Sequence, residues 1–599
     1  MADILKARGF GAHGIRRQHI PGFETEDIKG VLHAYLAGLN GWLTKMDAAA
    51  DFAQALGRID AVKTPRLWEY ASQYSKDMLR NSDRIDRITG NIKTVAFAWY
   101  LGGNIKTAVV NLTQNLIVGI PRLERYVTGG GGYWLKSTAD TIGLRYSGKG
   151  LRGARGLSPE EADMLQELYG NNVITDAYMD EIRGQIASSP SLRLWERFVR
   201  LLGKPMSMVE VFNRASLALA AYRAARRGAF KAGAAAELGL APGRKMTHEQ
   251  ARDFAAMLVR DTHFEYGRGH PPEFLRSNTA GRLLSPLFTF RSFGANILNL
   301  WWLALRHEGR EGRAFVARSL AATVALGGLT AFPFYATLSA LCTAASGDDE
   351  DWTTKIRQAL PQDDLLRDVV CYGLPAVAGV NIGGSLCMET SFTEGMRRGG
   401  TFKEAMTESL GALLGIPYDL AVNKPSRALE AHRFGEDAKA VEALVPTFMA
   451  NLMQALRLAT EGQTTLRGRP LNRPGQPGAR RLTPAEAVGK ALGFQPTSSA
   501  KSFEAYAADK LRTQVRGDRI DIFVNQALDD LDNKGRPYMM RELRKRLTAW
   551  NAEMEAAGRA DRKIQPKDVL RRVASRRRQN RPTPMQREKG AAQLALWGV

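Results

Sequence analysis

The fold class is decided by runs such as Ser158-Pro-Glu-Glu-Ala-Asp-Met-Leu-Gln-Glu-Leu-Tyr169, in which apolar residues recur at helical spacing behind a helix start. Ser158 suits the N-cap, proline suits the first turn, and Glu161 can return a hydrogen bond to the cap. The same pattern opens the segments that begin at Thr247 and Thr483. Alternating strand-like segments bounded by hairpin turns are nearly missing, so the sequence predicts a mainly α protein with little or no sheet.

Loop-rich breaks organise the chain into an extended multi-helix protein. One break is rich in glycine and another in proline and arginine, and both compositions resist regular structure. We therefore expect the following regions: an N-terminal helical region (1–127), a Gly-rich linker (128–157), a central helical region (158–318), an apolar helical region (319–460), a Pro/Arg-rich arm (461–484) and a basic C-terminal helical region (485–599).

Composition narrows the classes of partner. The 599 residues include 84 Lys and Arg against 61 Asp and Glu, which gives a formal net charge of +23. Such an excess suits nucleic acid, anionic lipid or an acidic protein. The three cysteines exclude a disulfide scaffold and a Cys-based zinc module. No basic segment followed by a compact apolar core opens the chain, so we expect no secretory signal.

Two long uncharged stretches, Ser319–Ala345 and Val369–Met388, distinguish the central third of the chain. The first is long and apolar enough to cross a bilayer, although glycines and prolines break both. If both crossed, the loop between them would be acidic and the outer flanks basic, as in a membrane hairpin. The alternative is a buried Ala/Gly-rich helical pair, and hydropathy leaves both open. The flanking charges are Arg313, Arg318, Asp348, Arg397 and Arg398.

Polar amides interrupt a third apolar tract, Val95–Ile120. A buried amide must find a hydrogen-bond partner, so amides along one helix usually bind a neighbouring helix rather than a ligand. We predict this structural role for Asn104, Asn111, Gln114 and Asn115.

The sequence contains only weak matches to catalytic motifs. The stretch Gly143–Gly150 approaches a phosphate-binding loop, but glycine replaces the hydroxyl that would hold magnesium. The segment Asp261–His270 contains two histidines and two carboxylates whose spacing fits no closed metal motif. Glu408 precedes a serine, as in some lytic transglycosylases, without any sign of a sugar-binding cleft. We expect no enzyme activity, no cofactor and no bound metal.

A basic cluster near the C-terminus is the stronger signal. Residues 561–590 hold eleven Lys and Arg and three Asp and Glu. Such a cluster attracts phosphates without reading sequence. The alternative is a solvated helix that answers an acidic neighbour in an assembly. The candidate phosphate contacts, which spread around a helix, are Arg571, Arg572, Arg576, Arg577 and Arg578.

The chain also resembles the large polyvalent proteins of bacteriophages, including those named for a PLxRFG motif. The matching positions are Pro286, Leu287, Arg291, Phe293 and Gly294. Compared with the motif, this chain has two extra residues before Arg291 and an extra serine before Phe293. Similar segments occur at Asn111–Gln114, Val445–Pro446 and Ala491–Pro496. Their order over about residues 95–500 carries the resemblance, and we expect the motif positions to be structural rather than catalytic.

The resemblance implies an internal virion, or ejection, protein of a short-tailed phage. Such proteins leave the capsid ahead of the genome and assemble into a conduit across the host envelope. The implied partners are further copies in a ring or tube, other core proteins, the portal and double-stranded DNA. The implied location is the virion interior and, after infection, the host periplasm and inner membrane. Two alternatives are a purely structural inner-core protein stacked on the portal and, less favoured, an envelope-degrading enzyme.

Overall fold

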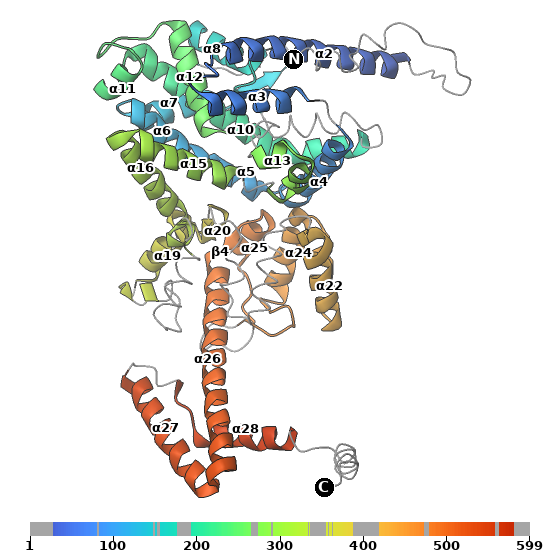
Figure 1. Ribbon diagram of the computed structural model, residues 1–599, viewed down its shortest axis with the longest axis vertical. Helices are drawn as coiled ribbons and strands as arrows, with labels where there is room; N and C mark the ends of the chain where they lie inside the picture. The colour runs from blue at the N-terminus through green and yellow to red at the C-terminus, as the bar shows by residue number, and fades with distance from the viewer. Residues whose placement is uncertain are drawn as a thin grey trace, which may run out of the picture.

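The computed structural model describes residues 28–80, 83–147, 150–152, 156–175, 193–264, 273–288, 292–332, 335, 355–356, 359–361, 363–386, 418–471, 479–556 and 562–579. Helices dominate these residues, which confirms the mainly α class. The strands in the same residues form only two-stranded antiparallel pairs, β1 with β2 and β3 with β4. The helices gather into an N-terminal, a middle and a C-terminal unit along the long axis (Figure 1).

The N-terminal unit holds most of the helices. Its elements are α2 (Ile28–Gly57), α3 (Pro65–Leu79), α4 (Arg84–Tyr100), α5 (Ile105–Leu112), η2 (Asn115–Gly119), α6 (Ile120–Tyr126), α7 (Gly130–Thr141), β1 (Arg145–Ser147), β2 (Gly150–Arg152), α8 (Pro159–Gly170), α10 (Arg193–Arg227), α11 (Ala232–Glu237), α12 (His248–Thr262), α13 (Glu273–Arg276), α14 (Thr279–Leu284), η4 (Ser285–Phe288), α15 (Ser292–His307) and α16 (Gly309–Gly327).

The middle and C-terminal units follow in chain order. The middle unit contains η5 (Leu329–Ala331), α19 (Asp364–Tyr372), η6 (Leu374–Ala378), β3 (Val380–Asn381), α20 (Gly383–Leu386), η9 (Asp419–Asn423), α22 (Lys424–Arg433), α23 (Asp437–Leu444), α24 (Thr447–Thr460), α25 (Pro484–Ala491) and β4 (Gln495–Pro496). The C-terminal unit contains most of α26 (Thr497–Lys534), α27 (Arg536–Ala556) and α28 (Pro566–Gln579).

Helix starts follow the sequence prediction. Ser158, Thr247 and Thr483 each accept a hydrogen bond from the third residue of the helix, whose side chain returns one to the cap. Each capping box therefore satisfies two backbone donors that a helix end would otherwise leave open. An N-cap of this kind contributes about 1 kcal/mol.

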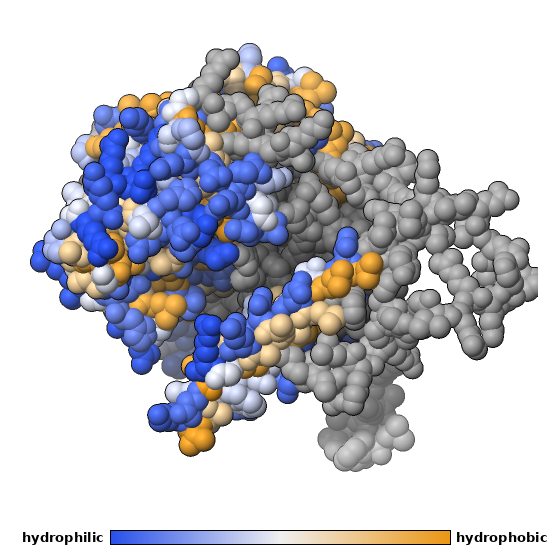
Figure 2. Space-filling view, turned by 90° about the horizontal axis from the view of Figure 1, so that it is seen from above, coloured by the Kyte–Doolittle hydropathy of each residue, from blue (hydrophilic) through white to orange (hydrophobic). Residues whose placement is uncertain are grey.

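The main core surrounds the second half of α10. Leu217 and Leu219 are fully buried, as are the alanines on either side of them. A helix that is apolar on every side must be enclosed by others, and α6, α8, α11 and α12 all contribute to this core. The surface of the described residues seen from above is largely hydrophilic, with small apolar patches between the polar ones (Figure 2).

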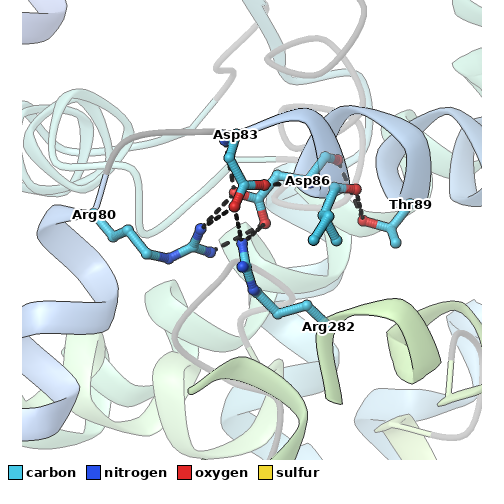
Figure 3. A network of polar contacts seen from close by, with 6 residues as sticks. Arg80, Asp83, Asp86, Thr89 and Arg282 are labelled. Atoms are coloured by element: carbon cyan, nitrogen blue, oxygen red, sulfur yellow. Dashed lines mark hydrogen bonds and ion pairs between the residues drawn. The ribbon is translucent and has the colours of Figure 1, made fainter. Parts of the chain in front are cut away.

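A polar network fastens α4 to α14 outside this core (Figure 3). Asp83 caps α4 and accepts from the Asp86 backbone N–H at 2.9 Å. Arg80 donates to both carboxylate oxygens of Asp86 at 2.9 and 3.0 Å. Arg282 of α14 donates to Asp83 at 2.6 Å. The hydrogen bond from the Asp86 backbone, followed by the hydrogen bond and charge of Arg282 and the charge of Arg80, lowers the pKa of Asp83 to about 2.

The segment 128–157 differs from the predicted linker, because it contains helix α7 and the β1–β2 hairpin. Gly129 adopts a left-handed conformation with φ of 74° directly before α7. A Cβ on Gly130 would lie 2.9 Å from the Glu124 side chain, so any other residue here would force that side chain to move. The glycines here serve a turn and a close helix contact.

The apolar stretch Ser319–Ala345 begins inside α16, not at a boundary between regions. Ser319 is fully buried, donates to the Ile117 carbonyl at 2.6 Å and accepts from Trp301 Nε1 at 3.1 Å. Residues 333–334 and 336–345 of this stretch lie outside the described residues. Within the described part of the chain, no helix combines the length and apolarity that a bilayer crossing requires.

The described parts of the two apolar stretches pack directly against each other. Gly328 has φ of 68° and faces the backbone of Cys371 and Tyr372, while Gly373 has φ of 83° and faces Leu326. A side chain at either glycine would overlap the backbone of the other stretch. For these residues the arrangement agrees with the buried-pair interpretation; residues 387–388 of the second stretch are outside the described part.

Helix α26 links the middle unit to the C-terminal unit. It is 38 residues long, which corresponds to about 57 Å. Near its start, Ala500 joins a small core with Cys371 and Tyr372. Further along, Val524 is fully buried in a separate core with residues of α27 and α28. The same straight helix therefore belongs to two cores (Figure 1).

Candidate nucleic-acid interface

Helix α28 carries all five predicted phosphate-contact arginines. It begins at Pro566 and buries Val569 and Val573 against α26. The carbonyl of Ile564, just before the helix, accepts a hydrogen bond from Asn551 of α27 at 3.0 Å. The apolar face and this bond fix the helix in a single rotation about its axis, so each arginine has a defined direction.

Three of the arginines bind carboxylates of α26. Arg572 and Arg576 both reach Asp521, at 3.0 and 3.1 Å. Arg576 also donates to the side chain of Asn525. Arg577 pairs with Asp532 at 3.1 Å. These arginines answer an acidic neighbour, as the alternative interpretation proposed, but the neighbour is another helix of the same chain.

Arg571 and Arg578 instead face outward. Both are exposed, and no hydrogen bond or ion pair joins either of them to another described residue. Lys567 has the same exposure and likewise no such bond. At 3.6 residues per turn, positions 567, 571 and 578 fall within about 40° of one another around the helix. We call these three residues the outward stripe.

Sequence reasoning overlooked both Lys567 and the division of the cluster into two faces. The signal for the stripe is the spacing i, i+4, i+11, which Lys567, Arg571 and Arg578 share. Asp521, Asn525 and Asp532 have the same spacing on α26 and bind the other arginines. The acidic stripe therefore shares its spacing with the cations that it does not bind, so spacing alone does not indicate which cations are paired.

The outward stripe suits a phosphate polymer. Exposed Lys and Arg release counterions when they neutralise phosphates, and this attraction ignores base sequence. The described residues from Arg516 onward hold sixteen Lys and Arg and nine Asp and Glu, so the surrounding field is also positive. On α28 no aromatic side chain accompanies the stripe, so stacking on single-stranded bases is not indicated.

The PLxRFG-like positions lie at the joint between α14 and α15. Pro286 is buried in the short helix η4, to which Leu287 also belongs, and η4 packs against α4. Phe293 and Gly294 lie in the first turn of α15. Arg291 is outside the described residues. The described motif positions therefore lie at a connection between helices that follows α14, whose Arg282 belongs to the network of Figure 3.

The predicted charged flanks of the apolar stretches are only partly described. Arg313 is exposed on α16. Arg318, the last charged residue of that helix, lies 3.6 Å from Glu124. The acidic flank Asp348 and the basic flanks Arg397 and Arg398 are outside the described residues, as is Glu408.

Two of the four predicted amides, Gln114 and Asn115, bind neighbouring helices through their side chains. Oδ1 of Asn104 is buried without a hydrogen-bond partner among the described residues, and Asn111 accepts from Asn213 only through its main-chain carbonyl. Asn115 lies in the π-helical turn η2 and donates to the Asn213 carbonyl of α10 at 2.9 Å. Gln114 donates to the Thr262 carbonyl of α12 at 2.9 Å. The Nε2–H of His263 donates to Asn115 Oδ1 at 3.0 Å. These bonds satisfy polar groups in a buried junction of three helices.

Nε2 of His263 is engaged in its hydrogen bond to Asn115 and offers no lone pair to a metal in this arrangement. It is buried, and its burial together with the Arg214 charge holds its pKa well below the ordinary value, so the ring is neutral. Asp261 accepts from Arg122 at 3.0 Å, away from the ring's hydrogen bond to Asn115. The other predicted members of this group, Glu265 and His270, are outside the described residues.

The stretch that approaches a phosphate-binding loop forms the β1–β2 hairpin, in which Ser147 pairs with Gly150. A phosphate-binding loop instead joins a buried strand to the start of a helix.

No known protein family, curated protein or solved structure matches the chain.

Proposed function

We propose that the chain is an internal virion protein of a short-tailed phage, a non-enzymatic subunit of an oligomeric conduit for viral DNA. The resemblance over about residues 95–500 suggests this class. The structural observation that carries the proposal is the outward stripe of Lys567, Arg571 and Arg578 on α28, next to a core of its own. The stripe offers cations to a phosphate polymer without a means of reading its sequence.

The architecture supports the same proposal. Helix α26 places the basic unit at one end of the molecule, far from the main core (Figure 1). A conduit subunit needs such a division, because one part must hold neighbouring subunits while another meets the DNA. Positive charge at the DNA-facing part offsets repulsion between packed phosphates during storage and passage.

Assembly into a ring or tube has its own support on α24. Met449, Leu452 and Leu456 recur at helical spacing, and their exposed fractions are 42%, 54% and 70%. Leu444 at the end of the preceding helix is 52% exposed. Contiguous apolar side chains of this kind commonly mark a contact between proteins. A further copy of the chain is the partner that the proposed conduit requires.

The experiment that tests the proposal is cryo-electron microscopy of particles produced from the genome that encodes the chain. We expect a ring of this protein on the portal axis inside the capsid. Particles that lack the protein, or that carry it only on the outer surface, would contradict the proposed role.

The second candidate is a structural inner-core protein that organises packaged DNA without entering a membrane. The packing of Gly328 against Cys371 and Tyr372 favours it, because the described apolar residues already have a protein partner. Dye leakage from anionic liposomes separates the two. Leakage that depends on the protein supports the conduit, and intact liposomes at both neutral and low pH support the inner core.

A further inference from the structure

Three potential metal ligands converge on the edge of the main core. Asp163 and Glu167 lie one turn apart on α8, and His248 is the first residue of α12. One ligand atom from each lies within 4.8 Å of the others. The two helices are separated by more than seventy residues of sequence, and both pack against α10.

A neighbouring tyrosine sets the tautomer of the histidine. Tyr222 Oη lies 2.9 Å from His248 Nδ1 and 3.3 Å from the carboxylate of Glu160. The Tyr222 hydroxyl has one proton to donate. Because Glu160 can only accept, that proton goes to Glu160 and the Nδ1–H of His248 donates to Tyr222 Oη. The lone pair of the ring is then on Nε2.

Nε2 of His248 has no hydrogen-bond partner among the described residues, although the atom itself is buried. Its nearest acidic oxygen, Oδ2 of Asp163, is 3.9 Å away, which is too long for a hydrogen bond. A nitrogen lone pair and two carboxylates thus face the same small space. Such a group is stabilised when a cation enters it.

We propose that Asp163, Glu167 and His248 form a binding site for a divalent transition metal, with Zn²⁺ as the best fit. Zn²⁺ takes imidazole nitrogen together with carboxylate oxygen, and three protein ligands leave a fourth position for water. The hydrogen bond from His248 to Tyr222 is the outer support that metal-ligating histidines usually have. Mg²⁺ suits the site poorly, because it prefers oxygen ligands alone.

The surrounding charges permit such an ion. Arg252 binds one oxygen of Glu167 at 2.6 Å, which leaves the other oxygen for the metal. The same guanidinium also binds Asp253 at 3.0 Å, so part of its charge is already balanced. Asp163 is 67% exposed, so an ion can enter from solvent. When bound, the ion would clamp the middle of α8 to the start of α12.

Zinc titration by calorimetry, on the full chain in a non-chelating buffer, tests the proposal. The matched control is His432→Ala, because His432 also pairs with an aspartate, Asp437, but within the described residues has no third ligand beside it. We expect His248→Ala to lose one Zn²⁺ equivalent that wild type and His432→Ala keep. We expect Tyr222→Phe to weaken that equivalent about 10-fold or more.

Thermal unfolding gives an independent readout. Zn²⁺ should raise the melting temperature of wild type and His432→Ala, and leave His248→Ala unchanged, because an ion that binds only the folded state stabilises it. If His248→Ala does not fold, Asp163→Asn replaces it in both measurements. Asp163 is exposed, so removing its charge should leave the core intact. Equal zinc stoichiometry and equal melting shifts in wild type, His248→Ala and Asp163→Asn would overturn the proposal.

Discussion

Arg571 and Arg576 lie five residues apart on α28 and face different surroundings: Arg576 binds Asp521 of α26, whereas Arg571 is exposed to solvent. The buried valines of α28 fix this difference, because they determine which face of the helix meets α26. The arginines look equivalent in the sequence. In the structure they separate into a face that binds α26 and a face that is open to a ligand.

The first prediction concerns DNA binding by the outward stripe. We expect the triple variant Lys567→Gln, Arg571→Gln, Arg578→Gln to bind duplex DNA more weakly, with a salt slope reduced by up to about 2.7, since each neutralised phosphate contributes about 0.9. Fluorescence anisotropy with two unrelated duplexes over a salt series measures the slope. Both duplexes should give the same affinity.

The matched control for this prediction removes the same charge from the paired face of the same helix. The variant Arg572→Gln, Arg576→Gln, Arg577→Gln should lose stability but keep most of the wild-type salt slope. If the two triple variants alter DNA binding equally, only net charge matters and the outward stripe is not an interface.

The second prediction concerns the ion pair between Asp83 and Arg282. The folded-state pKa of Asp83, about 2, lies below the ordinary value of about 3.9, so its stabilising contribution is present above pH 4 and is lost as the pH falls toward 2. Asp83→Asn keeps an N-cap and removes the charge. We expect it to cost about 0.5–1 kcal/mol at pH 6, with allowance for solvent screening.

Urea unfolding of wild type and Asp83→Asn at several pH values measures this contribution. The difference between the two proteins should shrink steadily below pH 4. A difference that stays constant down to pH 2 would assign the effect to the cap alone.

The third prediction concerns His263. Its folded-state pKa lies well below the unfolded value of about 6.5, so the neutral ring stabilises the fold above that pH and the contribution is lost as the pH falls. The loss should grow as the pH falls below 6.5, because the unfolded state then binds a proton that the folded state excludes. Chemical denaturation of His263→Gln should show a correspondingly flatter dependence on pH. An unchanged pH profile would mean that this ring does not titrate between the two states.

The fourth prediction compares two glycines that have positive φ angles. Gly239→Ala, at φ of 67° with open space beyond, should cost about 1 kcal/mol from backbone strain alone. Gly328→Ala adds an overlap with the Cys371 and Tyr372 backbone and should cost about 3 kcal/mol or more. Thermal or urea unfolding measures both, and equal costs would mean that the two apolar stretches do not approach each other this closely.

Local signals predicted local structure well. The capping boxes at Ser158, Thr247 and Thr483 form as expected, because all their donors and acceptors lie within four residues. The amide role of Asn115 was also predictable, because a buried amide requires a partner whatever the fold. The glycines of segment 128–157 misled the prediction, because a close contact between helices needs the same residue that a flexible linker uses.

Relations across long sequence separations were not predictable. Arg282 and Asp83 are 199 residues apart, and only the packing of α14 against α4 brings them together. The paired face of α28 depends on Asp521, and the proposed metal site depends on α8 and α12 meeting beside α10. No periodicity within one segment carries this information.

The reciprocal contact of Gly328 and Gly373 has an evolutionary consequence. Each position excludes a side chain because the backbone beside the other glycine already fills the space. A mutation at one of them is therefore not rescued by a smaller neighbouring side chain, since the obstacle is main chain. We expect descendants of this protein to retain both glycines or to lose the whole turn, which makes the pair a sensitive marker for aligning distant relatives.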